Sequence, residues 1–271
     1  MARGLGIIIT NDYSHTNSPL LGTCMDGHNL LETLVYSDFI VLWLHNINNQ
    51  TISDLMDEVK SLEEHESREF IQKYECILFA FSGHGLNNKY IEMQDASRVN
   101  VETDILEPLL PSSIRKFGEV PKVLLIDACR GSSVTATVST KFALDVITKE
   151  TIPAEGNYLL ACATMPGHYS FMYTKGSAWI QEFAHLARES TKSVVGILIN
   201  VNENLNKRAY RKEIAFQQPD MYVRLLREVH IHRNTIIESL DQHKYNVILS
   251  IIFTCLLVIV LFYIMNYLCF H

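Results

Sequence analysis

A cysteine and a histidine each follow directly on a short apolar run of this sequence. Cys129 lies in IDACRG after the run KVLLID (122–127), and His84 lies in FSGHG after ECILFAF (75–81). A thiol with a pKa of about 8.5 is a poor nucleophile at neutral pH until a base removes its proton. An imidazole can take that proton and return it to a leaving amine. The two residues together could therefore perform nucleophilic catalysis at a carbonyl carbon.

Glycines flank both residues and strengthen this interpretation. Gly85 follows the histidine, where a residue without a side chain lets the backbone approach a substrate closely. Its N–H group and that of Cys129 could stabilise an oxyanion. A lone cysteine or histidine at a strand end is more often structural, since a buried thiol packs as a small apolar group. The combination favours catalysis over that alternative.

The chain around these residues alternates between strand-like and helix-like segments. Asp26 is a candidate N-cap of the first helix. The strands are short and almost wholly apolar, as in an α/β fold whose mostly parallel sheet is covered on both faces. The carboxyl ends of such strands hold the functional site, so His84 and Cys129 should meet at one edge. We expect strands at 4–11, 39–45, 75–81, 122–127 and 157–164, and helices at 25–39, 51–62, 102–110, 177–190 and 193–210.

Composition narrows the class of protein. The 271 residues include 23 basic and 30 acidic side chains, which argues against a nucleic-acid surface. Six cysteines occur at spacings that match no zinc pattern, so we expect neither a metal ion nor another cofactor. The first residues, MARGLGIIITN, lack the apolar region and cleavage site of a signal peptide, and we expect the thiols to be reduced.

One segment differs sharply from the rest of the chain. Residues 245–270 carry no charged side chain, and the 19 residues from 247 to 265 would span about 28 Å as a helix, close to one hydrocarbon core. A buried core helix is the alternative, although few core helices lack a polar face for so long. We predict a juxtamembrane linker at 233–244 and a transmembrane helix at 245–268, a single-pass C-terminal anchor. Basic residues precede it, so the positive-inside rule places the catalytic domain in the cytosol.

The motifs around the two candidate catalytic residues resemble those of the caspase family. DACRG (127–131) is similar to the caspase pattern QAC[RQG]G, which has a histidine about 50 residues upstream, as SGHG (82–85) provides here. LLGTCMDGHNLLETL (20–34) and ACATMPGHYSFMYTKGSAWIQEF (161–183) resemble two further stretches of the family. The resemblance covers roughly residues 5–232. It implies the caspase-like (caspase-hemoglobinase) fold, a mostly parallel six-stranded sheet flanked by helices, and a cysteine endopeptidase acting on proteins or peptides.

The resemblance also implies an organisation of the chain and roles for its residues. The peptidase domain would span 1–232, with a large-subunit-like region at 1–131, a linker at 132–156 and a small-subunit-like region at 157–232 through which a homodimer could form. The site residues that the resemblance implies are the nucleophile Cys129, the general acid/base His84, the oxyanion N–H groups of Gly85 and Cys129, the groove residues Tyr169, Ser170 and Phe171, and Trp179 further along the groove.

The specificity pocket departs from the caspase pattern. Caspases hold a substrate aspartate with two arginines and a glutamine, and the aligned residues here are Leu20, Met172 and Asp127. A pocket with a carboxylate and no arginine repels aspartate and attracts a guanidinium. Metacaspases and paracaspases, which prefer arginine or lysine, also carry an aspartate two residues before the cysteine. We therefore expect cleavage after arginine or lysine.

Several alternatives stay open at this point. Asp127 could cap backbone groups at its strand end and never meet a substrate. The lost arginines are also compatible with a catalytically weak or inactive homologue that serves as an anchored scaffold or decoy. An active caspase that cleaves after aspartate in apoptosis-like signalling is a third possibility. A hydrolase of another α/β type is disfavoured, because the sequence contains no Gly-x-Ser-x-Gly elbow.

Overall fold

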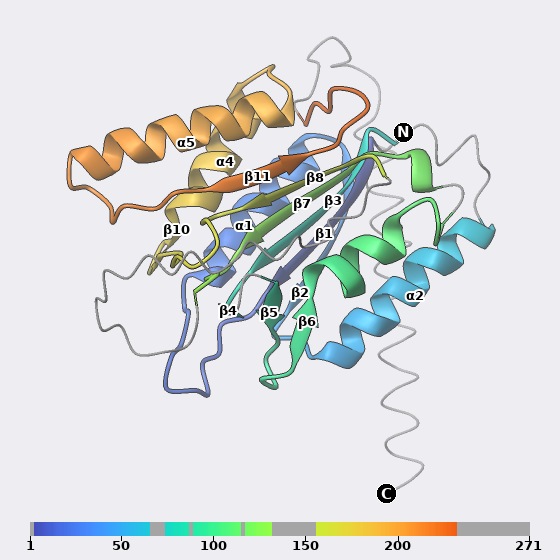
Figure 1. The fold of residues 1–271 in the computed structure, drawn as a ribbon, viewed down its shortest axis with the longest axis horizontal. Helices are drawn as coiled ribbons and strands as arrows, with labels where there is room; N and C mark the ends of the chain where they lie inside the picture. The colour runs from blue at the N-terminus through green and yellow to red at the C-terminus, as the bar shows by residue number, and fades with distance from the viewer. Residues whose placement is uncertain (1–2, 66–73, 87–88, 115–116, 132–155, 232–271) are drawn as a thin grey trace, which may run out of the picture. The chain divides into compact units, whose positions relative to one another are not determined.

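The central feature of the computed structural model is a six-stranded sheet (Figure 1). The structure describes residues 3–65, 74–86, 89–114, 117–131 and 156–231. The strand order of this six-stranded sheet is β11-β8-β7-β3-β1-β2. All neighbouring strands are parallel except β11 and β8, which are antiparallel. This arrangement confirms the predicted mostly parallel α/β sheet. The strands are β1 (Gly4–Thr10), β2 (Phe39–His45), β3 (Cys76–Ser82), β7 (Lys122–Asp127), β8 (Tyr158–Cys162) and β11 (Asp220–Val223).

Both faces of the sheet are covered, which explains why its central strands are largely apolar. On β7, Leu124 and Ile126 belong to a core cluster with α2 (Asn49–His65), while Val123 and Leu125 belong to a second cluster on the opposite face. That second face is covered by α1 (Thr23–Tyr36), α4 (Ala178–Glu189) and α5 (Val194–Tyr210). Because successive residues of a strand point to opposite faces, both sets are buried.

Small elements stand beyond the carboxyl ends of the strands. A three-stranded sheet comprises β4 (Gly85–Leu86), β5 (Tyr90–Glu92) and β6 (Arg98–Asn100), and a hairpin comprises β9 (Met172–Tyr173) and β10 (Gly176–Ser177). The α-helix expected at 102–110 is instead a π-helical turn, η1 (Val101–Leu106), followed by a 3₁₀ turn, η2 (Glu107–Leu109). Pro108 lacks an N–H group and cannot continue an α-helical ladder there. A further 3₁₀ turn, η3 (Phe117–Glu119), precedes β7.

The predicted role of Asp26 as a helix N-cap is wrong. The N-cap of α1 is Gly22, which makes no side-chain cap hydrogen bond, and Asp26 lies one turn into the helix. Its side chain is fully buried and accepts a hydrogen bond from the hydroxyl of Ser82, the last residue of β3. A capping side chain accepts from a backbone N–H group at the start of its own helix, whereas Asp26 accepts from Ser82 and Ser177, so this aspartate has a different role.

The predicted linker and anchor fall largely outside the described residues. Residues Met1–Arg233 form one compact unit of the chain. The linker predicted at 132–156, apart from Gly156, and the segments 233–244 and 245–268 are not among the residues that the structure describes. Within the described ranges, no helix is long and apolar enough to cross a membrane.

Candidate active site

The segments that carry His84 and Cys129 leave the sheet side by side. Neighbouring strands β3 and β7 are in register at Ser82 and Asp127, and the Gly83 N–H donates to the Asp127 carbonyl oxygen at 3.1 Å. A Cβ atom on Gly85 would lie 2.4 Å from the Cys129 carbonyl oxygen, so only glycine fits at this position. The structure thus brings His84, Gly85 and Cys129 to one edge of the sheet, as the sequence predicted.

The imidazole of His84 is held by a carbonyl group. Its Nε2 atom lies 2.7 Å from the Ser18 carbonyl oxygen. A carbonyl oxygen only accepts hydrogen bonds, so Nε2 carries the proton and Nδ1 of the neutral ring is the acceptor. Ser18 lies in the loop 11–22 between β1 and α1, which also carries Leu20. Sequence reasoning missed Ser18, because any residue type supplies a backbone carbonyl.

The Cys129 thiol is half-buried at the end of β7. It donates to the Ser170 carbonyl oxygen at a sulfur–oxygen distance of 3.6 Å. Burial raises the pKa of the thiol above its usual value, the Ser170 contact lowers it, and the neighbouring Asp127 raises it further. Among the described residues, the thiol bonds Ser170 and the imidazole bonds Ser18, so the predicted Cys/His dyad shares an edge without a mutual hydrogen bond. Such bonds often form only when a substrate binds.

Two carboxyl groups are buried beside the thiol. Asp127 is 1% exposed; its Oδ1 accepts the Ser170 hydroxyl, and the Ser177 hydroxyl lies near enough to lower the pKa of the carboxyl, while among the described residues its buried Oδ2 has no hydrogen bond of normal geometry. Asp26 is 0% exposed; it accepts the Ser82 hydroxyl at 2.8 Å and the Ser177 N–H at 2.9 Å. Burial raises the pKa of both carboxyls, and the charge of Asp127 raises that of Asp26 further. The side chain of Asp127 thus bonds a hydroxyl rather than backbone N–H groups, which disfavours the capping alternative.

Leu20 and Met172, the two residues that the resemblance aligns with arginines, lie close to one another. Leu20 is half-buried, and its N–H donates to the Asp12 carbonyl oxygen at 2.6 Å. Met172 is in β9, and its sulfur would lie 2.8 Å from a Cβ atom on Gly22, two residues after Leu20. The loop of Leu20 and the hairpin of Met172 are therefore neighbours, and each contributes an apolar side chain.

The predicted groove residues are partly exposed. Tyr169 and Phe171 are 47% and 38% exposed, and the Tyr169 ring would lie 3.2 Å from a Cβ atom on Gly131. The Phe171 N–H donates to Gln217 Oε1 at 3.2 Å, and the buried Gln217 also donates to a backbone carbonyl. Sequence reasoning missed Gln217. The expectation that Trp179 shapes the groove is wrong: it is 0% exposed and packs in the core under α4.

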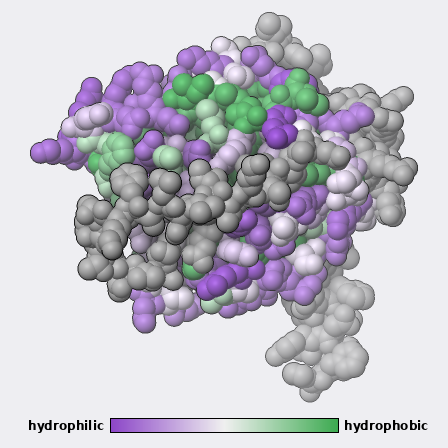
Figure 2. Space-filling view, viewed as in Figure 1, coloured by the Kyte–Doolittle hydropathy of each residue, from purple (hydrophilic) through white to green (hydrophobic). Residues whose placement is uncertain are grey.

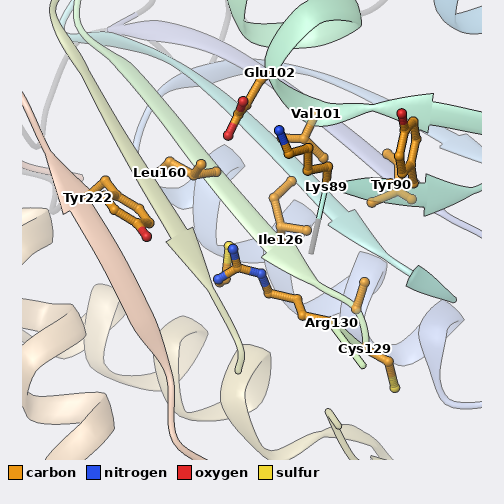
Figure 3. Close-up of a pocket in the computed structure, with 12 residues that line it drawn as sticks. Lys89, Tyr90, Val101, Glu102, Ile126, Cys129, Arg130, Leu160 and Tyr222 are labelled. Atoms are coloured by element: carbon orange, nitrogen blue, oxygen red, sulfur yellow. The ribbon is translucent and has the colours of Figure 1, made fainter. Parts of the chain in front are cut away.

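A cavity beside the end of β7 is lined by Ile126, Cys129 and Arg130 but not by Asp127 (Figure 3). Ile126, Leu160 and Cys162 line it, and these residues belong to the core cluster shared with α2. Figure 3 shows Arg130 extending into the cavity from the end of β7. Its guanidinium is buried and pairs with Asp220 of β11 at 3.2 Å. The cavity is therefore separate from the predicted specificity pocket, although both adjoin Cys129.

Comparison with known proteins identifies the family. A family model described as caspase domain matches residues 3–230. Caspase-3 of Mus musculus is 27% identical over 183 residues, which are 65% of this chain and 61% of that protein. Caspase-3 of Oryctolagus cuniculus is 26% identical over 212 residues, 74% of this chain and 72% of the relative. The crystal structure of caspase-1 from Spodoptera frugiperda shares the fold, with a TM-score of 0.67 at 19% identity over 87% of this chain and 92% of the other. The chain belongs to the caspase family of cysteine peptidases.

Proposed function

We propose that this protein is a cysteine endopeptidase that cleaves after arginine or lysine. The observation that supports the proposal most directly is the buried carboxyl group of Asp127, which among the described residues has hydroxyl groups beside it and pairs with no cation. A buried carboxylate is costly unless a cation compensates for its lost hydration. A substrate guanidinium would supply that cation and form charge-assisted hydrogen bonds. Leu20 and Met172 offer no positive charge to a substrate aspartate, which Asp127 would repel.

The proposed mechanism uses residues at the sheet edge. His84 Nδ1 takes the proton of the Cys129 thiol while the Ser18 carbonyl holds Nε2–H. The sulfur attacks the scissile carbonyl carbon, and the N–H groups of Gly85 and Cys129 stabilise the oxyanion. The imidazolium then protonates the leaving amine, and an acyl-enzyme remains on the sulfur. Attack by water, with the proton passing again through His84, releases the second product.

Ser170 connects the nucleophile and the pocket acid in this proposal. Its carbonyl oxygen accepts the thiol of Cys129, and its hydroxyl donates to Asp127. A substrate cation that bonds both carboxylate oxygens of Asp127 would compete with the Ser170 hydroxyl at Oδ1. A shift of Ser170 would also weaken the contact between its carbonyl oxygen and the thiol, so occupancy of the pocket and reactivity of the nucleophile would be coupled.

Peptides that differ only in the residue before the scissile bond test the specificity. We expect wild-type protein to cleave arginyl and lysyl peptides and to spare the aspartyl peptide. Asp127→Asn should lower kcat/KM for arginyl peptides by about 100-fold, because the charged pair is lost. Alkylation of Cys129 by iodoacetamide should persist in this variant. Preferred cleavage of the aspartyl peptide would contradict the proposal.

Self-processing of the segment 132–155 offers an independent test. Cleavage after Lys141 or Lys149 gives a new N-terminus at Phe142 or Glu150. Cleavage after Asp145 would give Val146, as caspase-like specificity requires. N-terminal sequencing of any processed form separates the two outcomes. An N-terminus at Val146 that disappears in a Cys129→Ala variant would argue against the basic pocket.

The scaffold alternative keeps one specific observation in its favour. The raised pKa of the Cys129 thiol and its hydrogen bond to Ser170, rather than to His84, describe an unactivated nucleophile. Labelling with arginyl and aspartyl electrophilic peptides distinguishes the two functions. An active peptidase is labelled at Cys129 by one of them, whereas a scaffold or decoy is labelled by neither.

We propose further that two copies associate through the edge of β11. This strand pairs only with β8 within the described sheet, and exposed apolar side chains lie on and after it: Tyr222, Val223 and Leu226. Figure 2 shows apolar surface where β11 and α5 lie on this face. An open, apolar strand edge favours pairing with another strand. Val223→Lys should lower the dimer fraction in light scattering, and an unchanged dimer would place the interface elsewhere.

We also propose that residues 245–268 anchor the protein in a membrane as a single-pass C-terminal helix, with the peptidase domain in the cytosol. The support is the charge-free run and the basic residues that precede it, among them Arg233 and Lys244. Anchoring would confine hydrolysis to proteins that reach that membrane surface.

A further inference from the structure

A buried tyrosine lies against the proposed catalytic histidine. Tyr13, in the loop 11–22, is 1% exposed and is one of the largest fully buried side chains. Its ring centroid lies 4.4 Å from that of His84, and the two planes are tilted by 39°. The same loop supplies the Ser18 carbonyl that accepts the His84 Nε2–H group. One loop therefore contacts the imidazole both at its face and at its outer nitrogen.

The hydroxyl of Tyr13 also fixes the backbone of His84. It accepts the His84 N–H at 3.1 Å and donates to the Glu92 carbonyl oxygen. The Glu92 N–H in turn donates to the His84 carbonyl oxygen at 2.9 Å. The three bonds form a closed ring in which the hydroxyl is inserted between the histidine and the strand β5. Burial raises the pKa of Tyr13, so the hydroxyl stays neutral and keeps its donor proton.

Two backbone features accommodate this tyrosine. Tyr13 has φ 51°, a left-handed conformation that disfavours any residue with a Cβ atom. A Cβ atom on Gly83, the residue before the histidine, would lie 2.8 Å from the Tyr13 hydroxyl oxygen. The left-handed turn and the glycine both permit the hydroxyl to reach the backbone of His84. A residue that only filled the core would need neither feature.

We propose that Tyr13 is a positioning residue for His84. The inference rests on the proposed peptidase function. The hydroxyl fixes the histidine backbone, and the ring face, packed on the imidazole, stabilises the imidazolium that forms when His84 takes the Cys129 proton. Tyr13 does not touch the reacting sulfur. It acts on the rate of the proton transfer and not on the binding of substrate.

The test compares two variants of Tyr13 with a matched control. Tyr13→Phe keeps the ring and removes the hydroxyl, whereas Tyr13→Leu removes both. Tyr158→Phe also removes one hydroxyl from a fully buried tyrosine, at the opposite end of the sheet, where Tyr158 pairs with Lys122. For each folded variant of the full chain, we measure kcat and KM on an arginyl peptide, the rate of iodoacetamide alkylation of Cys129 at pH 7, and the melting temperature.

We expect Tyr13→Phe to lower kcat by about 10-fold, because one hydrogen bond that orients His84 is lost. Tyr13→Leu should lower it by a further factor of about 5, because the ring no longer faces the cation. KM should stay within about two-fold, and the alkylation rate should fall in parallel with kcat. If kcat and the alkylation rate fall only in Tyr13→Leu, the ring rather than the hydroxyl positions His84, and the inference is retained.

Two results would overturn it. One is that both Tyr13 variants keep kcat and the alkylation rate of the wild type. The other is that Tyr158→Phe loses as much activity for the same fall in melting temperature, which would make the effect one of stability alone. Failure of the proposed function is separable, because in that case the wild-type protein itself cleaves no arginyl peptide.

Discussion

At the scale of single residues, burial distinguishes two cysteines that end neighbouring strands. Cys162, at the end of β8, is 5% exposed, and burial raises the pKa of its thiol to about 11. Cys129 follows β7 and is half-buried, with its sulfur beside the exposed Tyr169 segment. A thiolate forms far more readily at Cys129 than at Cys162. The sequence predicts the same assignment, with Cys129 as the nucleophile and Cys162 as a buried apolar residue of its strand.

The first prediction follows from this difference. Cys129→Ala should abolish hydrolysis while leaving the melting temperature almost unchanged, since it removes one partly solvated sulfur. Cys162→Ala is the matched control: it removes a packed core atom and should cost about 1–2 kcal/mol of stability while retaining activity. Steady-state hydrolysis and thermal unfolding of both variants check this. Inactivation by the Cys162 variant alone would move the nucleophile to β8.

The second prediction concerns the cost of the buried Asp127. Burial raises the pKa of its carboxyl in the folded state, so the ionised group destabilises the fold by about 1.4 kcal/mol for each tenfold change in acidity. The folded protein is favoured when the group is protonated, and this advantage is lost as pH rises through the folded-state pKa. Asp127→Asn should therefore raise the melting temperature at pH 7 by at least about 2 °C and have little effect at pH 4.

Asp95, which is exposed, provides a control whose contribution to stability depends on pH in the opposite direction. The Ser97 hydroxyl lowers the pKa of Asp95, so its contribution to stability is present above the unfolded-state pKa and is lost as pH falls. Asp95→Asn should lower the melting temperature slightly at pH 7 and not at acid pH. If Asp127→Asn behaves as Asp95→Asn does, the pocket acid already has a compensating partner in the free protein.

At the scale of elements, an ion pair ties the catalytic loop to the edge strand. Arg130 follows Cys129 directly and is 7% exposed, and it pairs with Asp220 at the start of β11. The backbone N–H of Arg130 also donates to the His168 carbonyl oxygen at 2.9 Å, in the segment that leads to the groove residues. The pair thus joins β7, β11 and the groove segment at one point.

The third prediction is that breaking this pair destabilises the domain. Asp220→Asn leaves the Arg130 guanidinium buried without its carboxylate, which typically costs about 3 kcal/mol or more and should lower the melting temperature by about 6–12 °C. The exposed pair of Asp57 and Lys60, 3.4 Å apart on α2, provides the comparison. Asp57→Asn should change stability by less than about 1 kcal/mol. Equal effects of the two variants would show that burial adds nothing to the Arg130 pair.

The elements were more predictable than the contacts between them. Strands at 39–45 and 122–127 coincide with β2 and β7, because both are short apolar runs; β7 is buried throughout, whereas β2 is a half-buried edge strand. No sequence pattern indicates that the Ser18 carbonyl bonds His84, since backbone groups carry no residue-specific signal. Asp26 was mistaken for a cap because aspartate is one of the residues preferred at the N-cap of a helix. Only the packing of α1 under the sheet edge reveals it as a second buried carboxyl.

At the scale of the whole molecule, peptidase activity and membrane attachment depend on different parts of the chain in our proposal. Residues 1–233 form a compact unit with its own core on both faces of the sheet. The residues of the described site all belong to the first unit. Peptidase activity and membrane attachment should therefore be separable by truncation, and one can fail without the other.

The fourth prediction uses this separation. Nineteen residues with two polar side chains, Ser250 and Thr254, span about one hydrocarbon core and resist extraction that removes peripheral proteins. The full chain should stay in the membrane pellet after alkaline carbonate treatment. A chain that ends at Lys244 should appear in the supernatant and cleave arginyl peptides at the full rate, because the compact unit is intact. In sealed vesicles, protease added from the cytosolic side should digest the domain, as the preceding basic residues imply. Release of the full chain by carbonate would show that the segment does not span the bilayer, whereas retention of both forms would place the membrane contact on the domain itself.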